Sequence, residues 1–303
     1  MTIHVVGNAC VDLSFWLAGD VPAGATVLAR RWRRRPGGKG LNQATAAARA
    51  GARVVLWAAV GDDGEAEAIQ AHLVGEGIGQ QGLAYRPGPS DISAIWIGPD
   101  GENRIVSAAD QAFAFRPADD PQFRGAIAAG DVVAGQGNLA PVATENAFRL
   151  ARANGARTAL NPSPVRDGRH PDLALVDLVV LNREEAAAAS GLGDPFAALA
   201  WLRGRAGGSV VVTLGADGAA LAEPGQPIRQ WPAPRVAAVD TSGAGDALFG
   251  TLLALWAAGR SLGEALPGAI AVAARAVERP GALDGLPPAG EVLRLIAGDA
   301  SAA

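Results

Sequence analysis

The chain has 303 residues, of which 49% are hydrophobic and 18% charged, so it can bury a large core and lacks the composition of a disordered protein. Its formal net charge of −4 argues against nucleic-acid binding as its main role, and its single cysteine, Cys10, rules out an internal disulfide framework. No apolar run is long enough to cross a membrane and nothing before Ile3 resembles a signal peptide, so we expect a cytoplasmic protein without a membrane or nucleic-acid partner.

Short apolar runs alternate with alanine-rich helical runs along the chain. Strands are predicted at residues 3–7, 54–60, 131–135, 158–161, 177–182 and 209–215, and helices near 41–50, 64–76, 144–154, 183–190 and 195–206. Central strands such as the one containing residues 210–212, three consecutive valines, are apolar throughout, as strands buried on both faces are. The alternation predicts a mostly parallel sheet sandwiched by helices.

Residues 11–36 and 88–107 interrupt this rhythm. They contain extended runs at 14–17, 26–30, 92–97 and 104–106, bounded by glycine and proline, with no helix between them. We interpret them as a small accessory sheet inserted into one domain of residues 1–303, where it could close over a pocket as a β-lid. Five arginines surround Trp32 within residues 30–35, and we interpret this run as a solvated edge of that sheet.

The most informative segment is residues 240–246, Asp-Thr-Ser-Gly-Ala-Gly-Asp, followed by an apolar helical run. The backbone N–H groups of Gly243, Ala244 and Gly245 could converge on an anion at the positive end of that helix. Asp246 would lie beside them as a general base, a combination typical of phosphoryl transfer. Two simpler alternatives are a carboxylate that only stabilises the helix start, and an incomplete dinucleotide loop with Leu248 in place of the third glycine.

Two further segments combine glycine or polar residues with a helix start. Residues 37–42, Gly-Gly-Lys-Gly-Leu-Asn, precede a helix predicted over 43–50; Asn42 could face a ligand there, or the segment could be a plain capping turn. It is not a Walker A loop, because the required first glycine and the Ser/Thr after the lysine are missing. Asn182 and Glu185 follow a predicted strand and could organise metal-bound water or simply cap a helix. The three histidines lack metal-ligand spacing, so no zinc or iron site is expected.

Taken together, these segments resemble the ribokinase-like (PfkB) family of carbohydrate kinases. The matching segments occur in the family's order, at residues 7–12, 37–43, 161–164, 182–185, 212–218 and 240–250. The resemblance implies a ribokinase-like three-layer α/β/α sandwich with a small β-sheet lid. It also implies ATP-dependent phosphorylation of a hydroxyl, most simply a primary one, of a small sugar. Two lids clasp each other in ribokinases, so a homodimer is implied as well.

The same resemblance assigns roles to individual residues. Asp246 matches the catalytic base, and Gly243, Ala244 and Gly245 match the anion hole. The sugar-binding positions correspond to Cys10, Asp12, Gly38, Lys39, Asn42 and Asn138. The ATP site corresponds to Asn182, Thr213, Gly215 and Gly218, with Glu185 holding Mg²⁺ through water. A site for a monovalent cation such as K⁺ corresponds to Asp240, Ser242, Ala276, Arg279 and Gly281.

The chain departs from the family pattern at three of these places. Ribokinases carry Asn at the position of Cys10 and Glu at the position nearest Asn138, so the resemblance favours the reaction over ribose itself as the substrate. Gly285 stands where the last cation ligand is expected and has no hydroxyl. Two other functions stay open: a nucleoside kinase in which Trp16 or Trp96 stacks on a base, and a non-catalytic sugar- or nucleotide-binding protein.

Overall fold

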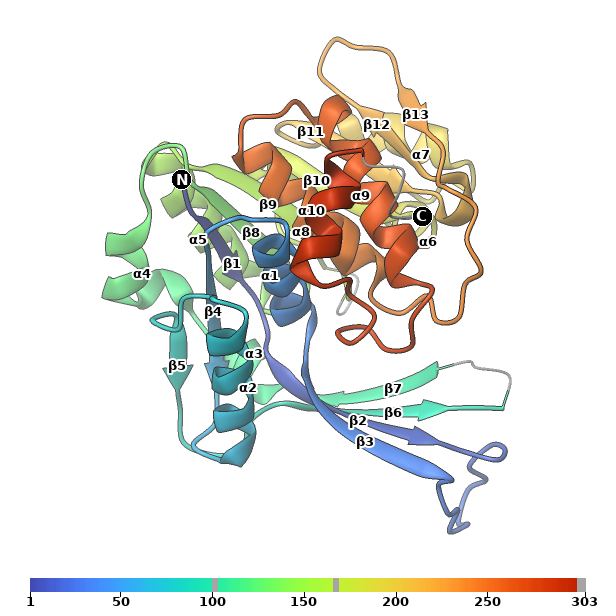
Figure 1. Ribbon diagram of the computed structural model, residues 1–303. Coiled ribbons are helices and arrows are strands. Elements are labelled where there is room, and N and C mark those ends of the chain that lie inside the picture. The colour runs from blue at the N-terminus through green and yellow to red at the C-terminus, as the bar shows by residue number, and fades with distance from the viewer. Residues whose placement is uncertain (100–102, 166–168, 299–303) are drawn as a thin grey trace.

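The computed structural model describes residues 1–99, 103–165 and 169–298, and it contains two β-sheets (Figure 1). The strands of the large sheet are β1 (Ile3–Val6), β4 (Val54–Val60), β5 (Leu83–Tyr85), β8 (Val132–Gln136), β9 (Arg157–Asn161), β10 (Leu178–Asn182), β11 (Ser209–Thr213), β12 (Ala219–Ala222) and β13 (Arg229–Trp231). Their order is β13-β12-β11-β10-β9-β8-β1-β4-β5, and all neighbours are parallel except β11-β12 and β12-β13. The predicted, mostly parallel sheet is confirmed.

Helices cover both faces of this sheet. One face carries α1 (Lys39–Arg49), α2 (Gly64–Gly75), α8 (Ala244–Ala257), α9 (Leu262–Ala276) and α10 (Ala289–Ile296). The other face carries α3 (Asp110–Ala114), α4 (Pro121–Ala126), α5 (Pro141–Ala153), α6 (Arg183–Ser190) and α7 (Pro195–Arg203). Successive strand residues alternate between the two cores, as Val5 and Val6 do, because side chains of a strand point to opposite faces. Both faces of the sheet are therefore buried, which gives three layers.

The second sheet has four strands in the order β3-β2-β6-β7 and projects beside the body as a lid (Figure 1). Its strands are β2 (Cys10–Trp16), β3 (Arg31–Gly37), β6 (Ile92–Ile97) and β7 (Asn103–Ala108). Residues in register share a face, so Asp12, Ser93 and Ser107 line one side of the lid and Leu13, Ala94 and Val106 line the other. The first side faces the body, because Asn103, on that side, donates a hydrogen bond to Ser242.

The arginine run was correctly interpreted as a sheet edge, but the strand predicted over residues 26–30 is wrong. The edge strand is β3, which contains four of the five arginines and pairs antiparallel with β2 from Cys10 opposite Gly37 to Trp16 opposite Arg31. An edge strand needs no apolar run, because its pairing to β2 and the contacts of its side chains hold it in place. The helix predicted over 43–50 also begins earlier, at Lys39.

Three short helical turns complete the described secondary structure: η1 (Pro117–Asp119), η2 (Leu173–Leu175) and η3 (Gly215–Asp217). In the three described ranges, no helix has the length and apolar character needed to cross a membrane. The alanine- and glycine-rich sequence after Ile296 predicts a frayed tail, most of which, residues 299–303, lies outside the described residues.

The order of the large sheet positions the functional site. From β1 the chain runs outward to β4 and β5 in one direction, whereas β8 to β11 extend in the other. Ligands bind open α/β sheets at the carboxyl ends of the strands where this reversal occurs. Asn8 follows β1, Gln136 ends β8 and Asn161 ends β9, so polar residues gather at the switch point.

Candidate functional site

Asp246 lies in the first turn of α8 and is only 5% exposed. Its two carboxylate oxygens are held by α1: Asn42 Nδ2 donates to Oδ2 at 3.1 Å and Gln43 Nε2 donates to Oδ1 at 2.9 Å. Lys39 Nζ lies 3.9 Å from Oδ1. The carboxylate therefore makes its hydrogen bonds to another helix rather than to the end of its own, which is not the arrangement of a helix cap.

The loop before Asp246 has the properties of an anion cradle. Gly243 adopts φ +79° at the start of α8, and a Cβ there would lie 2.5 Å from the carbonyl oxygen of Ala282. A Cβ on Gly245 would meet no atom within 4 Å, so a ligand can approach that backbone closely. Across the described part of the chain, the N–H groups of Gly243 and Gly245 have no acceptor, whereas the Ala244 N–H makes a long 3.4 Å bond to Thr241 O. Two free donors at a helix N-terminus suit a phosphate oxygen.

A cleft of about 200 Å³ opens over this loop. Its lining comes from the starts of α1 and α8, from the ends of β9, β10 and β11, and from the residues just after them: Lys39, Asn161, Val180, Leu181, Asn182, Glu185, Thr213, Thr241, Gly243, Gly245 and Asp246. The structure thus brings together predicted residues that lie more than 200 positions apart in sequence. Gly215 and Gly218 do not line the cleft; they adopt φ values of +63° and +91° in the turn after β11.

Asn182 and Glu185 form the start of α6. Asn182 Oδ1 accepts from the Glu185 N–H at 2.7 Å, and Glu185 Oε2 accepts from the Asn182 N–H at 2.9 Å. The capping interpretation is confirmed, yet Glu185 Oε1 has no hydrogen-bond partner in the residues that the structure describes. This free carboxylate oxygen in the cleft is of the ligand type that Mg²⁺ prefers. Nowhere in those residues do three His, Cys, Asp or Glu side chains gather as a metal site.

Asp12 and Cys10 lie where β2 enters the lid. Cys10 Sγ donates to Asp12 Oδ1 at 3.4 Å and lies 3.8 Å from Ser93 Oγ. Burial raises the pKa of Asp12 to about 6; the Cys10 and Ser93 hydrogen bonds lower it, and the charge of Asp246 raises it further. Burial also raises the pKa of the Cys10 thiol well above its usual range. Cys10 is therefore a buried thiol whose raised pKa disfavours the thiolate, the form that acts as a nucleophile.

The glycine-rich segment before α1 packs against these residues. A Cβ on Gly37 would overlap the Asp12 carboxylate, and Gly38, the residue just before α1, has φ +98°. Asn42 Oδ1 and Asn138 Oδ1 are buried without a hydrogen-bond partner among the described residues. Buried acceptors are normally paired, so each can take a bond from a ligand hydroxyl. Asn138 lies two residues beyond the end of β8, on the same edge of the sheet.

The five residues assigned to a monovalent cation also come together. Asp240 Oδ1 accepts from the Ser242 N–H at 2.9 Å and Oδ2 accepts from the Gly281 N–H at 2.8 Å. The carbonyl oxygens of Ala276, Arg279 and Gly281 would lie 3.0, 3.2 and 2.5 Å from a Cβ on Gly285. Carbonyl oxygens that could coordinate a cation therefore converge around Gly285. One of them, that of Gly281, already accepts a hydrogen bond from the Gly285 N–H at 2.8 Å.

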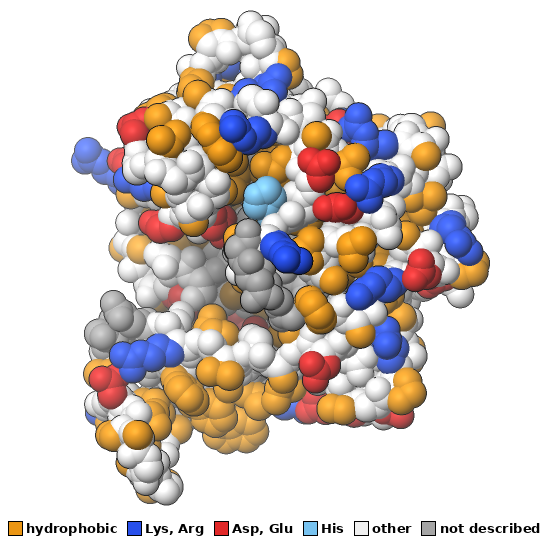
Figure 2. Space-filling view, turned by 180° about the vertical axis from the view of Figure 1, so that it is seen from behind, with side chains coloured by type: hydrophobic (Ala, Val, Ile, Leu, Met, Phe, Trp, Pro, Cys, Tyr) orange, Lys and Arg blue, Asp and Glu red, His pale blue; other side chains and the backbone are white. Residues whose placement is uncertain are grey.

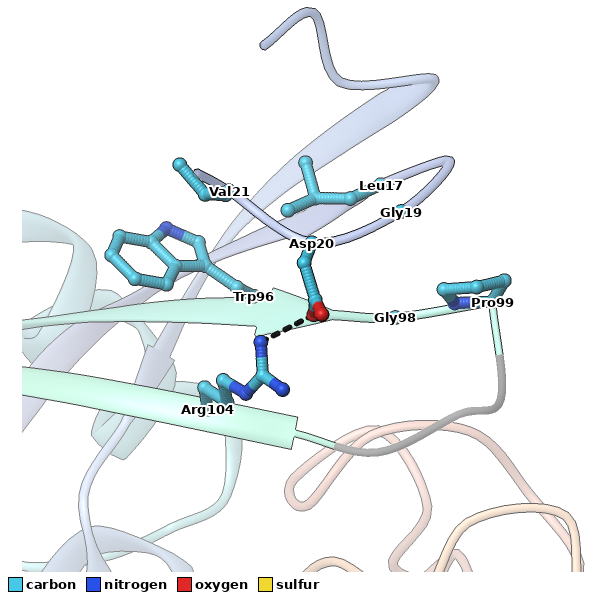
Figure 3. Close-up of a pocket in the computed structure, with 8 residues that line it drawn as sticks. All are labelled: Leu17, Gly19, Asp20, Val21, Trp96, Gly98, Pro99 and Arg104. Atoms are coloured by element: carbon cyan, nitrogen blue, oxygen red, sulfur yellow. Dashed lines mark hydrogen bonds and ion pairs between the residues drawn. The ribbon is translucent and has the colours of Figure 1, made fainter. Parts of the chain in front are cut away.

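The two tryptophans considered for base stacking do not face the cleft as an open platform. Trp96 is on the opposite side of the lid from Asp12, where it lines a pocket with Leu17 and Val21 beside the Asp20–Arg104 ion pair (Figure 3). The Arg31 guanidinium covers the Trp16 ring at 3.9 Å from its centroid. The arrangement of these rings gives no support to a nucleoside as the substrate.

Sequence reasoning missed the amides behind Asp246. Gln43, Gln136 and Asn161 are buried side chains linked to each other and to Asp246 by hydrogen bonds. Gln43 and Asn161 lie inside recognised segments, but Gln136 had no signal beyond its place at the end of a strand. The lid contact from Asn103 to Ser242 was also invisible in the sequence.

Comparison with known proteins gives matches over nearly the whole chain. The model of the pfkB family carbohydrate kinases matches residues 2–289. The ribokinase of Mus musculus is 30% identical over 260 residues, which cover 82% of this chain and 80% of that protein. The deoxyribokinase of Salmonella typhi is 29% identical over 259 residues, 82% of this chain and 84% of that protein. The structure of Arabidopsis thaliana ribokinase complexed with ribose and ATP superposes with a TM-score of 0.86 at 25% identity, covering 97% of this chain and 98% of that one.

Proposed function

The chain belongs to the pfkB family of carbohydrate kinases, and we propose that Asp246 is its general base. The enzyme phosphorylates a sugar at the expense of ATP. The observation that carries the assignment is the Asp246 carboxylate itself, buried, held by two amide donors and next to the free N–H groups of Gly243 and Gly245. A protein that only binds sugar needs no such base.

The geometry supports a simple division of labour. A sugar hydroxyl, most simply a primary one, gives its proton to Asp246 as its oxygen attacks the γ-phosphorus of ATP, and ADP leaves. The backbone of residues 243–245 at the start of α8 receives the charge on the transferred phosphoryl group, Gly243 and Gly245 through free N–H donors and Ala244 through one already weakly engaged. The lid shields this exchange from water, so that transfer to water is suppressed.

Asn182 and Glu185 are proposed to hold Mg²⁺ through water, and the free Glu185 Oε1 in the cleft fits that role. Bound there, the ion would neutralise charge on the phosphates of ATP. Thr213 at the end of β11, with Gly215 and Gly218 in the following turn, would border the nucleotide.

The sugar is proposed to lie between the lid and α1. Its contacts would come from Cys10, Asp12, Gly38, Lys39, Asn42 and Asn138. Related proteins named ribokinase and deoxyribokinase make pentoses the first candidates. ADP release measured across pentoses, hexoses, sugar phosphates and nucleosides would test this proposal, and a small sugar should give the highest kcat/KM. If only nucleosides were phosphorylated, the proposed substrate class would be wrong; if nothing were, the non-catalytic alternative would stand.

The loop formed by Asp240, Ser242, Ala276, Arg279 and Gly281 is proposed as a K⁺ site. Its carboxylate and carbonyl oxygens are hard donors that suit this ion, although Gly285 contributes no hydroxyl. Turnover measured in K⁺ and in tetramethylammonium at equal ionic strength tests this site, and K⁺ should give the higher rate. Equal rates would remove the cation from the proposal.

We also propose that residues 1–303 form one kinase domain that includes the lid. Two copies of the chain would form a dimer through their lids, in the cytoplasm, where ATP is available. The outer side of the lid carries Trp32 and Val106, which are 64% and 58% exposed. Hydrophobic side chains gather on the lower surface near the lid in Figure 2. Trp32→Asp should turn a dimer into a monomer in sedimentation analysis, and a wild-type monomer would contradict the proposal.

A further inference from the structure

A chain of three buried amides lies behind Asp246. Gln43 Nε2 donates both to Asp246 Oδ1 at 2.9 Å and to Asn161 Oδ1 at 3.2 Å, and Gln136 Nε2 donates to Gln43 Oε1 at 2.8 Å. Gln43 is 0% exposed and Gln136 only 1%. Amides buried so deeply are costly unless they are hydrogen-bonded, so each bond in the chain constrains the next.

The direction of the chain is set by the backbone. Asn161 Nδ2 donates to the carbonyl oxygen of Val180 in β10 at 3.0 Å. Because a carbonyl can only accept, Asn161 must turn its own Oδ1 toward Gln43. Gln43 must then present its NH₂ group to Asn161 and its oxygen to Gln136. The hydrogen bond to the Val180 carbonyl of β10 thus fixes the orientation of all three amides, and Asp246 Oδ1 faces the NH₂ group of Gln43.

Two glycines leave room for this chain. A Cβ on Gly7 would overlap Gln136 Oε1, and a Cβ on Gly250 would overlap the backbone oxygen of Gln43. Gln43 and Gln136 therefore sit in spaces that any larger residue at these positions would close. The sheet and α8 both approach α1 closely around them.

We infer that Gln43 is a positioning residue that fixes the carboxylate of Asp246 for catalysis, and that Asn161 and Gln136 fix Gln43. Asn42 holds Oδ2 and Gln43 holds Oδ1, so the carboxylate cannot rotate, while each oxygen keeps a lone pair for the proton of the sugar hydroxyl. A base held in one orientation loses little freedom on reaching the transition state. The inference rests on the proposed role of Asp246.

The sharpest test replaces the donor without changing the shape of the side chain. Gln43→Glu puts a second carboxylate beside Asp246, and like charges resist joint ionisation. The pH of half-maximal kcat/KM on the acidic side should rise by about one unit or more. Gln43→Met removes the donor without adding charge, so kcat should fall between about tenfold and a hundredfold, the sugar KM should change little and the acidic midpoint should not rise.

Gln111 provides the matched control. It is also a buried glutamine, 7% exposed, and its Nε2 donates to the carbonyl oxygens of Pro87 and Pro89 away from the cleft. Gln111→Met should lower the melting temperature as Gln43→Met does while leaving kcat and the pH profile unchanged. If Gln43→Glu does not fold, Gln136→Met takes its place, because it removes the donor that fixes Gln43. This variant should lower kcat about three- to tenfold at unchanged KM.

Two results would overturn the inference. One is a folded Gln43→Glu enzyme with the acidic midpoint of the wild type; the other is a Gln43→Met enzyme whose kcat equals that of Gln111→Met. Asp246→Asn separates this failure from failure of the proposed function. If Asp246→Asn is inactive and the Gln43 variants are not, only the positioning role falls; if Asp246→Asn is fully active, the proposed base falls as well.

Discussion

The carboxylate of Asp12 lies in a buried environment that opposes its negative charge. Its pKa of about 6 lies above the 3.8 of an unperturbed aspartate, chiefly because of burial. Between about pH 4 and pH 6 the folded protein keeps a proton that the unfolded chain releases. Stability therefore falls as the pH rises through this window, and the cost stays in full above it. A charge kept in place at such a cost is what a sugar-binding site requires.

Asp12→Asn should consequently stabilise the free enzyme while weakening sugar binding. Above pH 6 we expect the free energy of unfolding to rise by about 1–2 kcal/mol, after allowance for partial exposure of the carboxylate, and below pH 4 the gain should vanish. Denaturant unfolding at pH 4 and pH 7.5 measures both values. Asp63→Ala is the contrasting variant, because Asp63 caps α2 and its loss should destabilise by about 1 kcal/mol. A less stable Asp12→Asn protein at pH 7.5 would contradict this account.

Cys10 and Asn138 are expected to decide which sugar is accepted. The Cys10 thiol is a weak hydrogen-bond donor and already donates to Asp12, so it contributes little hydrogen bonding to a sugar hydroxyl. Cys10→Asn combined with Asn138→Glu should raise the kcat/KM for ribose relative to the true substrate by about tenfold or more. Each single variant, assayed on the same two sugars, separates the two positions. An unchanged ratio in the double variant would count against the assignment.

The lid is joined to the loops around the anion cradle at Asp284 and at Ser242. Arg33 Nη1 donates to Asp284 Oδ2 at 2.6 Å, with Arg35 Nε 3.5 Å from the same oxygen, and Asn103 Nδ2 donates to Ser242 Oγ at 2.9 Å. Ser242 immediately precedes Gly243, and Asp284 belongs to the loop whose Gly281 N–H is bound by Asp240. The arginines of β3 thus fasten the lid to the body.

Loss of either contact should raise the sugar KM with a smaller effect on kcat. We expect about a two- to fivefold rise for Asp284→Asn and for Asn103→Ala, since an exposed pair contributes at most about 1 kcal/mol. Added salt should raise the KM of the wild type but not that of Asp284→Asn, because salt screens the ion pair. Arg34→Gln is the control, as Arg34 pairs with Glu65 of α2 on the other side of β3. Equal effects of Asp284→Asn and Arg34→Gln would refute the specific role of Asp284.

At the scale of the whole molecule, the central sheet was predictable because its strands are apolar runs buried on both faces. Its antiparallel edge, β12 and β13, and the helices α9 and α10 were not recognised; α9 even contains Pro267. The strand β3 was misplaced because its four arginines conceal the alternation that marks a strand. β12 has the sequence Ala-Ala-Leu-Ala and β13 the sequence Arg-Gln-Trp, so neither short strand carries the β-branched residues that mark a strand.

The same distinction holds for the site. Asp246, the 243–245 loop, Asn182 and Glu185 lie in short segments whose chemistry can be read locally. The amide chain could not be found in that way, because Gln43 is separated from Gln136 by 93 positions and from Asn161 by 118. Only the folded sheet brings them together behind the base.

Turnover by Asp246→Asn, measured beside ATP affinity by calorimetry, tests the central claim most directly. Removal of the proton acceptor should lower kcat by roughly 10²–10⁴-fold while ATP binding stays close to that of the wild type. A variant that binds ATP normally and turns over at nearly the wild-type rate would show that Asp246 is not the base.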